Sequence, residues 1–140
     1  MDSTRTAMNE IITEMEGEGM GNKKTALYCR VAHECEMAIM NQEMFLLRFA
    51  SENSYSDCVV YRDNGFSGSN MDRPAMKALL EDMHNGRIGT LIVKDISRLG
   101  RNFLEVDPYI TEVFQPMGVS FVSIVDGYDS SRDGDLFSSN

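Results

Sequence analysis

Tryptophan is absent from this 140-residue sequence, and cysteine, proline and histidine are scarce. Cys29, Cys35 and Cys58 lack the paired spacing of a zinc site, and their odd number does not suit a disulfide framework. His33 and His84 complete no metal set and no cysteine–histidine pair. We therefore expect reduced thiols, a cytoplasmic location, no metal and no cofactor.

The sequence also lacks long apolar runs and nucleotide-binding motifs. None of its hydrophobic stretches approaches the ~20 residues that cross a membrane. The first residues lack the basic start and apolar block of a secretory signal. Neither GxxxxGKS/T nor GxGxxG occurs, which argues against a P-loop and against a dinucleotide-binding fold.

Basic residues are in the minority, with 13 Lys and Arg against 22 Asp and Glu, a net charge of −9. Because neutralised phosphates supply most non-specific affinity for DNA, this balance argues against a domain that grips DNA by itself. The acids crowd both ends of the chain, whereas basic residues gather between Lys94 and Arg101. A local anion site on an acidic domain is compatible with this asymmetry.

The chain has the length of one domain with a buried core. Residues 1–23 are polar, Glu-rich and punctuated by glycine, so we expect a flexible acidic leader. Residues 24–128 hold the apolar periodic segments, and residues 129–140, rich in Ser, Asp and Gly, are expected to form a frayed C-terminal end.

Between these ends, β-rich apolar runs alternate with segments of helical periodicity. Strands are predicted over 25–31, 57–63, 89–95 and 119–125, and helices over 37–53, over 75–86 and between the third and fourth strands. In the first helix, Met37, Met40, Met44 and Leu47 share one face. The pattern predicts an α/β fold with a mainly parallel sheet of four to five strands in the order 2-1-3-4, flanked by helices. Ligands of such sheets bind beyond the strand ends where the winding reverses, here between strands one and three.

Two helix starts can be placed from capping residues. Asp72 is expected to cap the second helix, with Pro74 in its first turn. The third helix has two candidate starts. One is Asn102, which forms a capping box with Glu105, and the other is Asp107, which precedes a proline.

The first strand ends in the segment LYCRVAHE. Since side chains alternate along a strand, Tyr28, Arg30 and Ala32 point one way and Cys29 the other. A phosphate held near Arg30 would lie over Ala32, where a hydroxyl could have attacked it. The alternative is that Ala32 is only a small residue at a crowded strand end.

The third strand leads into VKDISRLGR, which carries Lys94, Arg98 and Arg101 before a helix start. A guanidinium forks onto two phosphate oxygens, and helix amides add partial positive charge. Such a group would stabilise a phosphoryl transition state. The alternative is a solvated basic loop paired with this chain's many acids.

A third set of polar residues surrounds the loop DNGFSGSNMDRP. Asp63 stands at a strand end, and Arg73 at a helix start could fold over a phosphate, because Gly65 and Gly68 make the loop pliable. Gln42, on the helix expected beside strand one, could donate a hydrogen bond toward the same crevice. A plain surface loop and a surface glutamine are the alternatives.

Together, the segments LYCRVA, NQ, YRDNGFSGSNMDRPAM, GTLIVKDISRLGRN and MGVSFVSIVDGYDS resemble the catalytic domain of the serine recombinases (resolvase/invertase family), closest in style to its large transposon-type members. The resemblance runs from about Thr25 to Ser130. It implies a resolvase-like catalytic domain over residues 24–128. Family members form dimers and tetramers, cleave both strands of two DNA sites through 5′-phosphoserine links, and rejoin the ends without ATP or metal.

The resemblance also implies roles for individual residues. Ala32 matches the position of the nucleophilic serine, Arg30, Arg73, Arg98 and Arg101 match the arginines that bind the scissile phosphate, and Gln42 and Asp63 resemble residues that organise the site. At the position of Ser97, many small family members carry an aspartate, whereas the large members resemble this sequence. The identity of the general base stays open.

Ala32 departs from the family pattern, so the chain as written is expected to be inactive. Because every other expected site residue is present, we favour a recent or engineered loss of the serine. A natural non-catalytic member that serves in dimerisation or regulation is the first alternative, and an unrelated flavodoxin-like domain for a phosphorylated ligand is the second. The DNA-binding regions of the family have no counterpart here, so we expect weak DNA binding by this domain and self-association only in the full-length protein.

Overall fold

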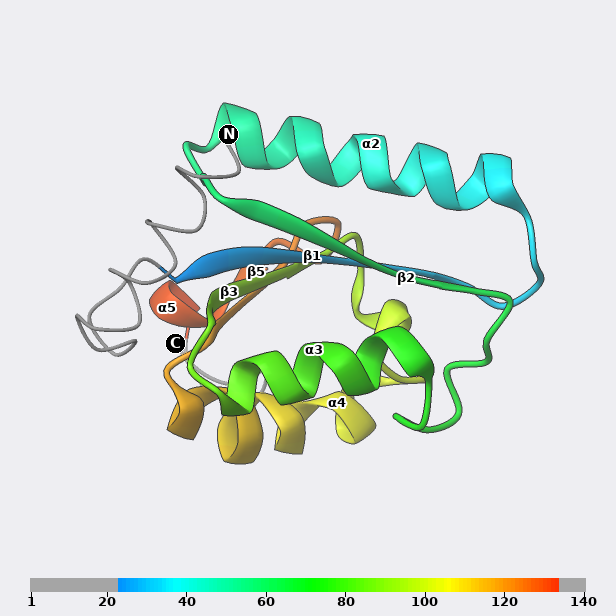
Figure 1. Cartoon of the computed structure of the whole chain (residues 1–140). Coiled ribbons are helices and arrows are strands. Elements are labelled where there is room, and N and C mark those ends of the chain that lie inside the picture. The colour runs from blue at the N-terminus through cyan, green and yellow to red at the C-terminus, as the bar shows by residue number, and fades with distance from the viewer. Residues whose placement is uncertain (1–22, 134–140) are drawn as a thin grey trace, which may run out of the picture.

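The computed structural model describes residues 23–133, which form one five-stranded sheet in the order β2-β1-β3-β4-β5 (Figure 1). The strands are β1 (Lys24–Val31), β2 (Cys58–Asn64), β3 (Ile88–Val93), β4 (Ser120–Ser123) and β5 (Tyr128–Asp129). β1 to β4 pair in parallel, and β5 pairs antiparallel with β4. The predicted α/β fold and strand order are thereby confirmed. The expectations for residues 1–22 and 134–140 lie outside the described residues.

Helices cover both faces of the sheet (Figure 1). The helix α2 (Glu36–Glu52) lies on one face, and α3 (Pro74–His84) and α4 (Phe103–Tyr109) lie on the other. A 3-10 turn (Ile96–Arg98) follows β3, and a short α5 (Ser130–Asp133) follows β5. Within residues 23–133, no helix combines the length and apolar content needed to cross a bilayer.

The alternation of β1 builds a core on each face of the sheet. Ala26 and Tyr28 belong to the apolar cluster under α3 and α4. Leu27 and Cys29 belong to the cluster under α2. The predicted orientation of the Tyr28 face is therefore correct, and Cys29 points away from it.

The methionine stripe of α2 does not face the core. The buried residues of this helix are Ile39, Gln42, Leu46 and Ala50, whereas the side chain of Met37 is 68% exposed. Gln42 explains the orientation, because its amide side chain is hydrogen-bonded to the backbone of β1. The helix was predicted correctly, but the apolar stripe read from its periodicity lies outward.

The start of α3 also differs from the prediction. The N-cap position is Arg73, with Pro74 in the first turn. Asp72 does not cap the helix; its exposed carboxylate pairs with Lys77 at 3.0 Å. The carboxylate of Asp63, at the end of β2, accepts the free amides of the first turn instead.

The helix α4 begins at the first of the two candidate starts. The side chain of Asn102 accepts a hydrogen bond from the amide of Glu105 at 3.0 Å. Pro108 then lies inside the helix, and the chain continues as a π turn over Ile110–Phe114. Proline cannot donate the ladder hydrogen bond of the helix, and the π turn begins two residues after it.

Candidate active site

The ends of β1, β2 and β3 bring together side chains that are distant in the sequence. Arg30 lies near the end of β1, and Asp63 near the end of β2. Arg98 follows β3, and Arg73 precedes α3. This is the point where the winding reverses between β1 and β3, as expected for a ligand site in an α/β sheet.

Arg30 is buried, and backbone carbonyls hold all parts of its guanidinium. Its Nε donates to the carbonyl of Arg98 at 3.0 Å. One terminal nitrogen donates to Phe66 O at 2.8 Å, and the other donates to Ser97 O at 2.6 Å. Burial lowers the pKa of this guanidinium, and the positive charge of Arg73 lowers it further.

Arg98 returns one of these hydrogen bonds. Its Nη1 donates to the carbonyl of Arg30 at 2.9 Å, and its Nη2 lies 3.4 Å from the carboxylate of Asp95. The Nε of Arg98 is buried and has no acceptor among the described residues. The terminal nitrogens of Arg98 are thus paired, whereas its Nε is a donor without an acceptor in the described part of the chain.

Arg73 is the largest fully buried side chain of the domain, only 1% exposed. Its guanidinium carbon lies 5.7 Å from the centroid of the Tyr28 ring. Its terminal nitrogens donate to the carbonyls of Ser67 at 3.2 Å and Leu99 at 3.0 Å. Its Nε, like that of Arg98, is buried and without an acceptor in the described part of the chain.

Asp63 joins β1, β2 and α3. Its carboxylate accepts the hydroxyl of Tyr28 at 2.6 Å and the amides of Ala75 and Met76 at 2.8 and 3.0 Å. Burial raises the pKa of Tyr28, and the hydrogen bond to Asp63 raises it further. Through the Tyr28 ring, Asp63 helps to position Arg73.

Gln42 pairs with the backbone beside the site. Its side-chain oxygen accepts from Arg30 N at 2.9 Å, and its side-chain nitrogen donates to Arg30 O at 3.1 Å. The side-chain amide of Gln42 therefore joins α2 to the backbone of β1 through two hydrogen bonds. The prediction that Gln42 lies beside strand one agrees with its position.

Two basic residues of the segment after β3 lie outside the cluster. The side chain of Arg101 is 67% exposed and pairs with Glu105 at 2.9 Å. The backbone amide of Arg101 donates to the Glu105 carboxylate at 2.8 Å and lowers the pKa of that carboxyl, and the hydrogen bonds from the Arg101 guanidinium lower it further. Lys94 extends toward α2, where its ammonium lies 5.7 Å from the Phe45 ring centroid.

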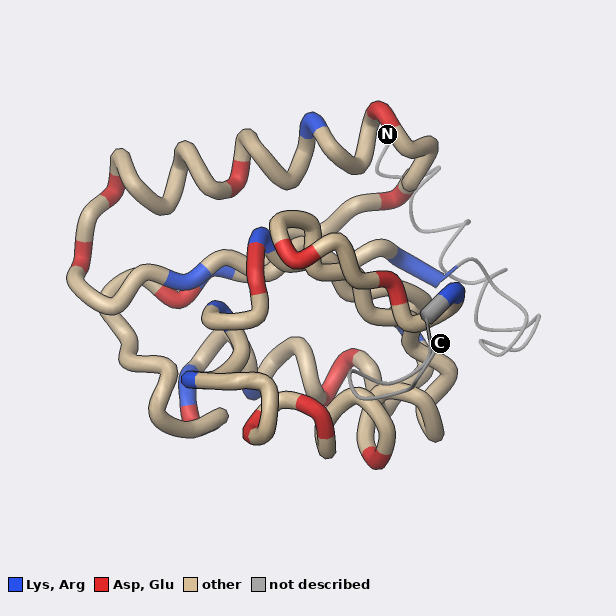
Figure 2. The backbone as a smooth tube through the Cα atoms, turned by 180° about the vertical axis from the view of Figure 1, so that it is seen from behind, with Lys and Arg blue, Asp and Glu red and all other residues tan. Residues whose placement is uncertain are grey.

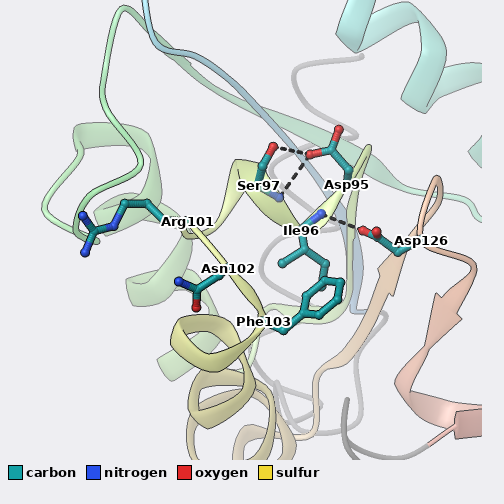
Figure 3. A pocket seen from close by; sticks show the side chains of 7 residues that line it. All are labelled: Asp95, Ile96, Ser97, Arg101, Asn102, Phe103 and Asp126. Atoms are coloured by element: carbon teal, nitrogen blue, oxygen red, sulfur yellow. Dashed lines mark hydrogen bonds between the residues drawn. The ribbon is translucent and has the colours of Figure 1, made fainter.

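A pocket adjoins the cluster on the side of α4 (Figure 3). It is lined by Asp95, Ile96, Ser97, Arg101, Asn102, Phe103 and Asp126. Asp126 accepts the amide of Ile96 at 2.8 Å, and Asp95 accepts both the amide and the hydroxyl of Ser97. The guanidinium of Arg101 points away from both acids (Figure 3). Sequence reasoning assigned no role to Asp95 or Asp126; their place after neighbouring parallel strands was the available signal.

Ala32 follows β1 directly and is exposed. Its methyl group offers no atom that could act as a nucleophile. Cys29 cannot replace a nucleophile there, because it lies in the core under α2 and burial raises the pKa of its thiol to about 12. Ser67 and Ser69 belong to the exposed loop after β2.

The described residues contain no group of three or more His, Cys, Asp or Glu side chains placed to hold a metal ion. The cationic groups that converge at the strand ends, with two unused guanidinium donors, suit an anion that carries several acceptor oxygens.

Comparison with known proteins identifies the family. Residues 25–139 match the family model described as Resolvase, N terminal domain. A candidate DNA recombinase of Bacillus subtilis (strain 168) is 30% identical over 114 residues, which make up 80% of this chain and 22% of that protein. The chain thus spans about a fifth of this relative.

Solved structures agree with this assignment. The N-terminal catalytic domain of TP901-1 integrase is 30% identical, with a TM-score of 0.73, and the match covers 80% of this chain and 86% of that one. A resolvase family site-specific recombinase from Streptococcus pneumoniae is 29% identical, with a TM-score of 0.67 and coverage of 80% and 78%. The C-terminal catalytic domain of ISC1926 TnpA, an IS607-like serine recombinase, is 26% identical, with a TM-score of 0.61 and coverage of 73% and 69%. The chain therefore belongs to the resolvase family, in which it matches the catalytic domains of serine recombinases.

Proposed function

We propose that this domain is the catalytic domain of a serine site-specific DNA recombinase, present in a form that is inactive because Ala32 occupies the nucleophile position. The main support is the pair of buried Nε donors on Arg73 and Arg98, which have no acceptor in the described part of the chain. Buried polar groups are nearly always hydrogen-bonded, so two unpaired guanidinium donors in one cationic cluster favour an anion-binding role over a purely structural one. A DNA phosphate supplies acceptor oxygens of the required charge.

The proposed chemistry follows from the family and from the positions of the arginines. A serine hydroxyl at position 32 gives up its proton, and its oxygen attacks the phosphorus of the scissile phosphodiester and forms a new O–P bond. The bond from phosphorus to the DNA 3′ oxygen breaks, and that oxygen takes up a proton. Arg30, Arg73, Arg98 and Arg101 stabilise the charge that develops on the phosphoryl oxygens. The phosphoserine link keeps the phosphodiester bond energy, so the ends rejoin without ATP.

The chain as written cannot take the first step, because alanine has no oxygen to attack phosphorus. The remaining residues of the proposed site, Arg30, Gln42, Asp63, Arg73, Arg98 and Arg101, are all present. This pattern favours a recent or engineered loss of the serine. A natural non-catalytic member that acts through dimerisation or regulation is the alternative.

DNA is the proposed substrate of the full-length protein, whereas we expect the isolated domain to bind it weakly. Lys and Arg are interspersed with acidic residues over the described chain, and α2 carries a single basic residue among three acidic ones (Figure 2). Because neutralised phosphates supply most non-specific affinity for DNA, this charge distribution and the net charge of −9 disfavour tight binding by the domain alone. We assign sequence-specific contacts and assembly into dimers and tetramers to regions outside this domain.

Restoring the serine tests the proposal. The full-length gene product is prepared with Ala32 and with Ala32→Ser, and each is incubated with DNA from the ends of its own genetic element. A denaturant-resistant protein–DNA adduct with Ala32→Ser alone is the expected result. An Ala32→Val variant is the matched control, because it enlarges the side chain without supplying an oxygen, and no adduct is expected from it. Site binding without any adduct in the serine form would support the non-catalytic alternative.

A further inference from the structure

The loop between β2 and α3 lies directly on the arginine cluster. The carbonyl of Phe66 accepts from Arg30 at 2.8 Å, and the carbonyl of Ser67 accepts from Arg73 at 3.2 Å. The same loop is attached to the end of β1, since the amides of Gly65 and Phe66 donate to Val31 O at 2.8 and 3.1 Å. It thus passes beside position 32 and occupies guanidinium nitrogens of Arg30 and Arg73, two of the three arginines in the cluster.

Gly68 permits this close approach. A Cβ atom at this position would lie 2.7 Å from Nη2 and 3.0 Å from Cζ of Arg30. The φ angle of Gly68 is outside the left-handed region, so the backbone itself would accept alanine. The absence of a side chain is needed only because the loop packs on the guanidinium.

In this arrangement the cluster cannot bind a phosphate through all its arginines. Arg73 is 1% exposed, and the carbonyls of Phe66 and Ser67 already occupy one terminal nitrogen of Arg30 and one of Arg73. The loop buries little apolar surface, because Ser67 and Ser69 are exposed and Phe66 is 37% exposed. Segments that bury few apolar contacts open at low free energy.

We propose that Phe66–Gly68 form an autoinhibitory latch, in which backbone carbonyls hold Arg30 and Arg73 until a phosphate displaces them. The identity of the displacing anion rests on the proposed function, whereas the latch contacts do not. When the latch opens, charged phosphate oxygens replace the neutral carbonyls of Phe66 and Ser67 as acceptors, and charged oxygens form stronger hydrogen bonds with a guanidinium. Only the opened domain binds the anion, so the closed population lowers its apparent affinity.

The test uses the 140-residue chain, labelled with ¹⁵N, and inorganic phosphate as the probe. Phosphate binding is followed by the NMR signals of the arginine Nε–H groups, and the loop by hydrogen exchange of the Gly65 and Phe66 amides. The variant Gly68→Ala places a methyl group against Arg30 and forces the latch open. Ser69→Ala, in the same exposed loop, is the matched control.

The latch predicts that phosphate accelerates hydrogen exchange of the Gly65 and Phe66 amides in the parent, although ligands ordinarily protect. It also predicts that Gly68→Ala binds phosphate about three- to tenfold more tightly than the parent, while Ser69→Ala binds as the parent does. Slower loop exchange with phosphate would overturn the latch, because it would show the loop closing over the anion. Equal or weaker binding by Gly68→Ala, or no binding by either protein, would also overturn it. Adduct formation by Ala32→Ser decides the proposed function separately.

Should Gly68→Ala fail to fold, the parent measurement alone still decides, because the direction of the change in loop exchange separates the two outcomes.

Discussion

Arg30 and Arg98 each donate a guanidinium hydrogen bond to the backbone carbonyl of the other, at 3.0 and 2.9 Å. One residue belongs to β1 and the other to the 3-10 turn after β3, 68 positions later in the sequence. The exchange locks the two strand ends together. It also fixes both side chains at the reversal of the sheet winding.

This reciprocal pair makes a prediction about Arg98→Lys. Lysine keeps the charge but cannot reproduce the forked hydrogen bonds, and it leaves the Arg30 carbonyl with one partner fewer. We expect the free energy of unfolding to fall by about 1–3 kcal/mol, measured by urea denaturation. Arg101→Lys is the control, because the Arg101 side chain is 67% exposed; a change within about 0.5 kcal/mol is expected. Equal effects of the two substitutions would contradict the pairing.

Asp63→Ala is predicted to destabilise the domain more than the substitution of the exposed Asp72 at the start of α3. The substitution leaves the Tyr28 hydroxyl and two helix amides without their acceptor. We expect a loss of about 2–3 kcal/mol, against about 1 kcal/mol for Tyr28→Phe. The double variant should lose less than the sum, because the two residues share one hydrogen bond. Strict additivity in denaturant unfolding would show that the bond carries no energy.

Asp72→Ala is the matched control for Asp63→Ala. Its carboxylate lies near the same helix start but is 75% exposed and pairs only with an exposed lysine. We expect a change within about 0.5 kcal/mol.

Alkaline pH is predicted to weaken the fold through Tyr28. Burial and the bond to Asp63 raise its pKa above the ordinary value of about 10. Above that pH the unfolded chain loses the phenolic proton first, so the unfolded state binds fewer protons and the free energy of unfolding falls as the pH rises. The decline approaches about 1.4 kcal/mol per pH unit for one such group. It should be smaller in Tyr28→Phe, and parallel profiles of the two proteins between pH 9 and 11 would refute this.

The three thiols are predicted to react in a fixed order. Cys35 is exposed, Cys58 is partly buried, and Cys29 is buried with a pKa raised to about 12. With Ellman's reagent at pH 8 we expect one fast phase from Cys35, and reaction of Cys29 only after unfolding in guanidinium. The fast phase should disappear in Cys35→Ser. Its persistence would place a second thiol at the surface.

The sheet was predictable from the sequence because the two-residue alternation of β1 and the apolar runs of the other strands specify which faces are buried. The convergence of Arg30 and Arg98 followed from strand order alone. The face of α2 was not predictable in this way. Its three methionines equal the buried Ile39, Leu46 and Ala50 in number, and a polar contact from Gln42 to β1 decides the orientation.

Capping by a residue distant in sequence was also beyond local reasoning. Asp72 lies where a local cap would be expected, yet Asp63 reaches the first turn of α3 from β2. The carbonyl partners of the arginines were equally invisible, because backbone acceptors leave no pattern of residue types. The roles assigned to the arginines, to Gln42, to Asp63 and to Ala32 stay predictions that the experiments above address.

The most direct measurement maps the covalent link in the Ala32→Ser protein. The adduct with DNA is digested with nuclease and trypsin, and the peptide that carries the nucleotide is identified by mass spectrometry. Cleavage after Arg30 and Arg48 releases a peptide whose only hydroxyl side chain is the new serine at position 32. Ser97 and the loop residues Ser67 and Ser69 leave in other peptides.

A nucleotide on the peptide that follows Arg30 is the predicted result, and it would establish position 32 as the nucleophile position of a disabled recombinase. A nucleotide on a peptide with Ser67, Ser69 or Ser97 would contradict the account, because the attacking group would then belong to a different segment.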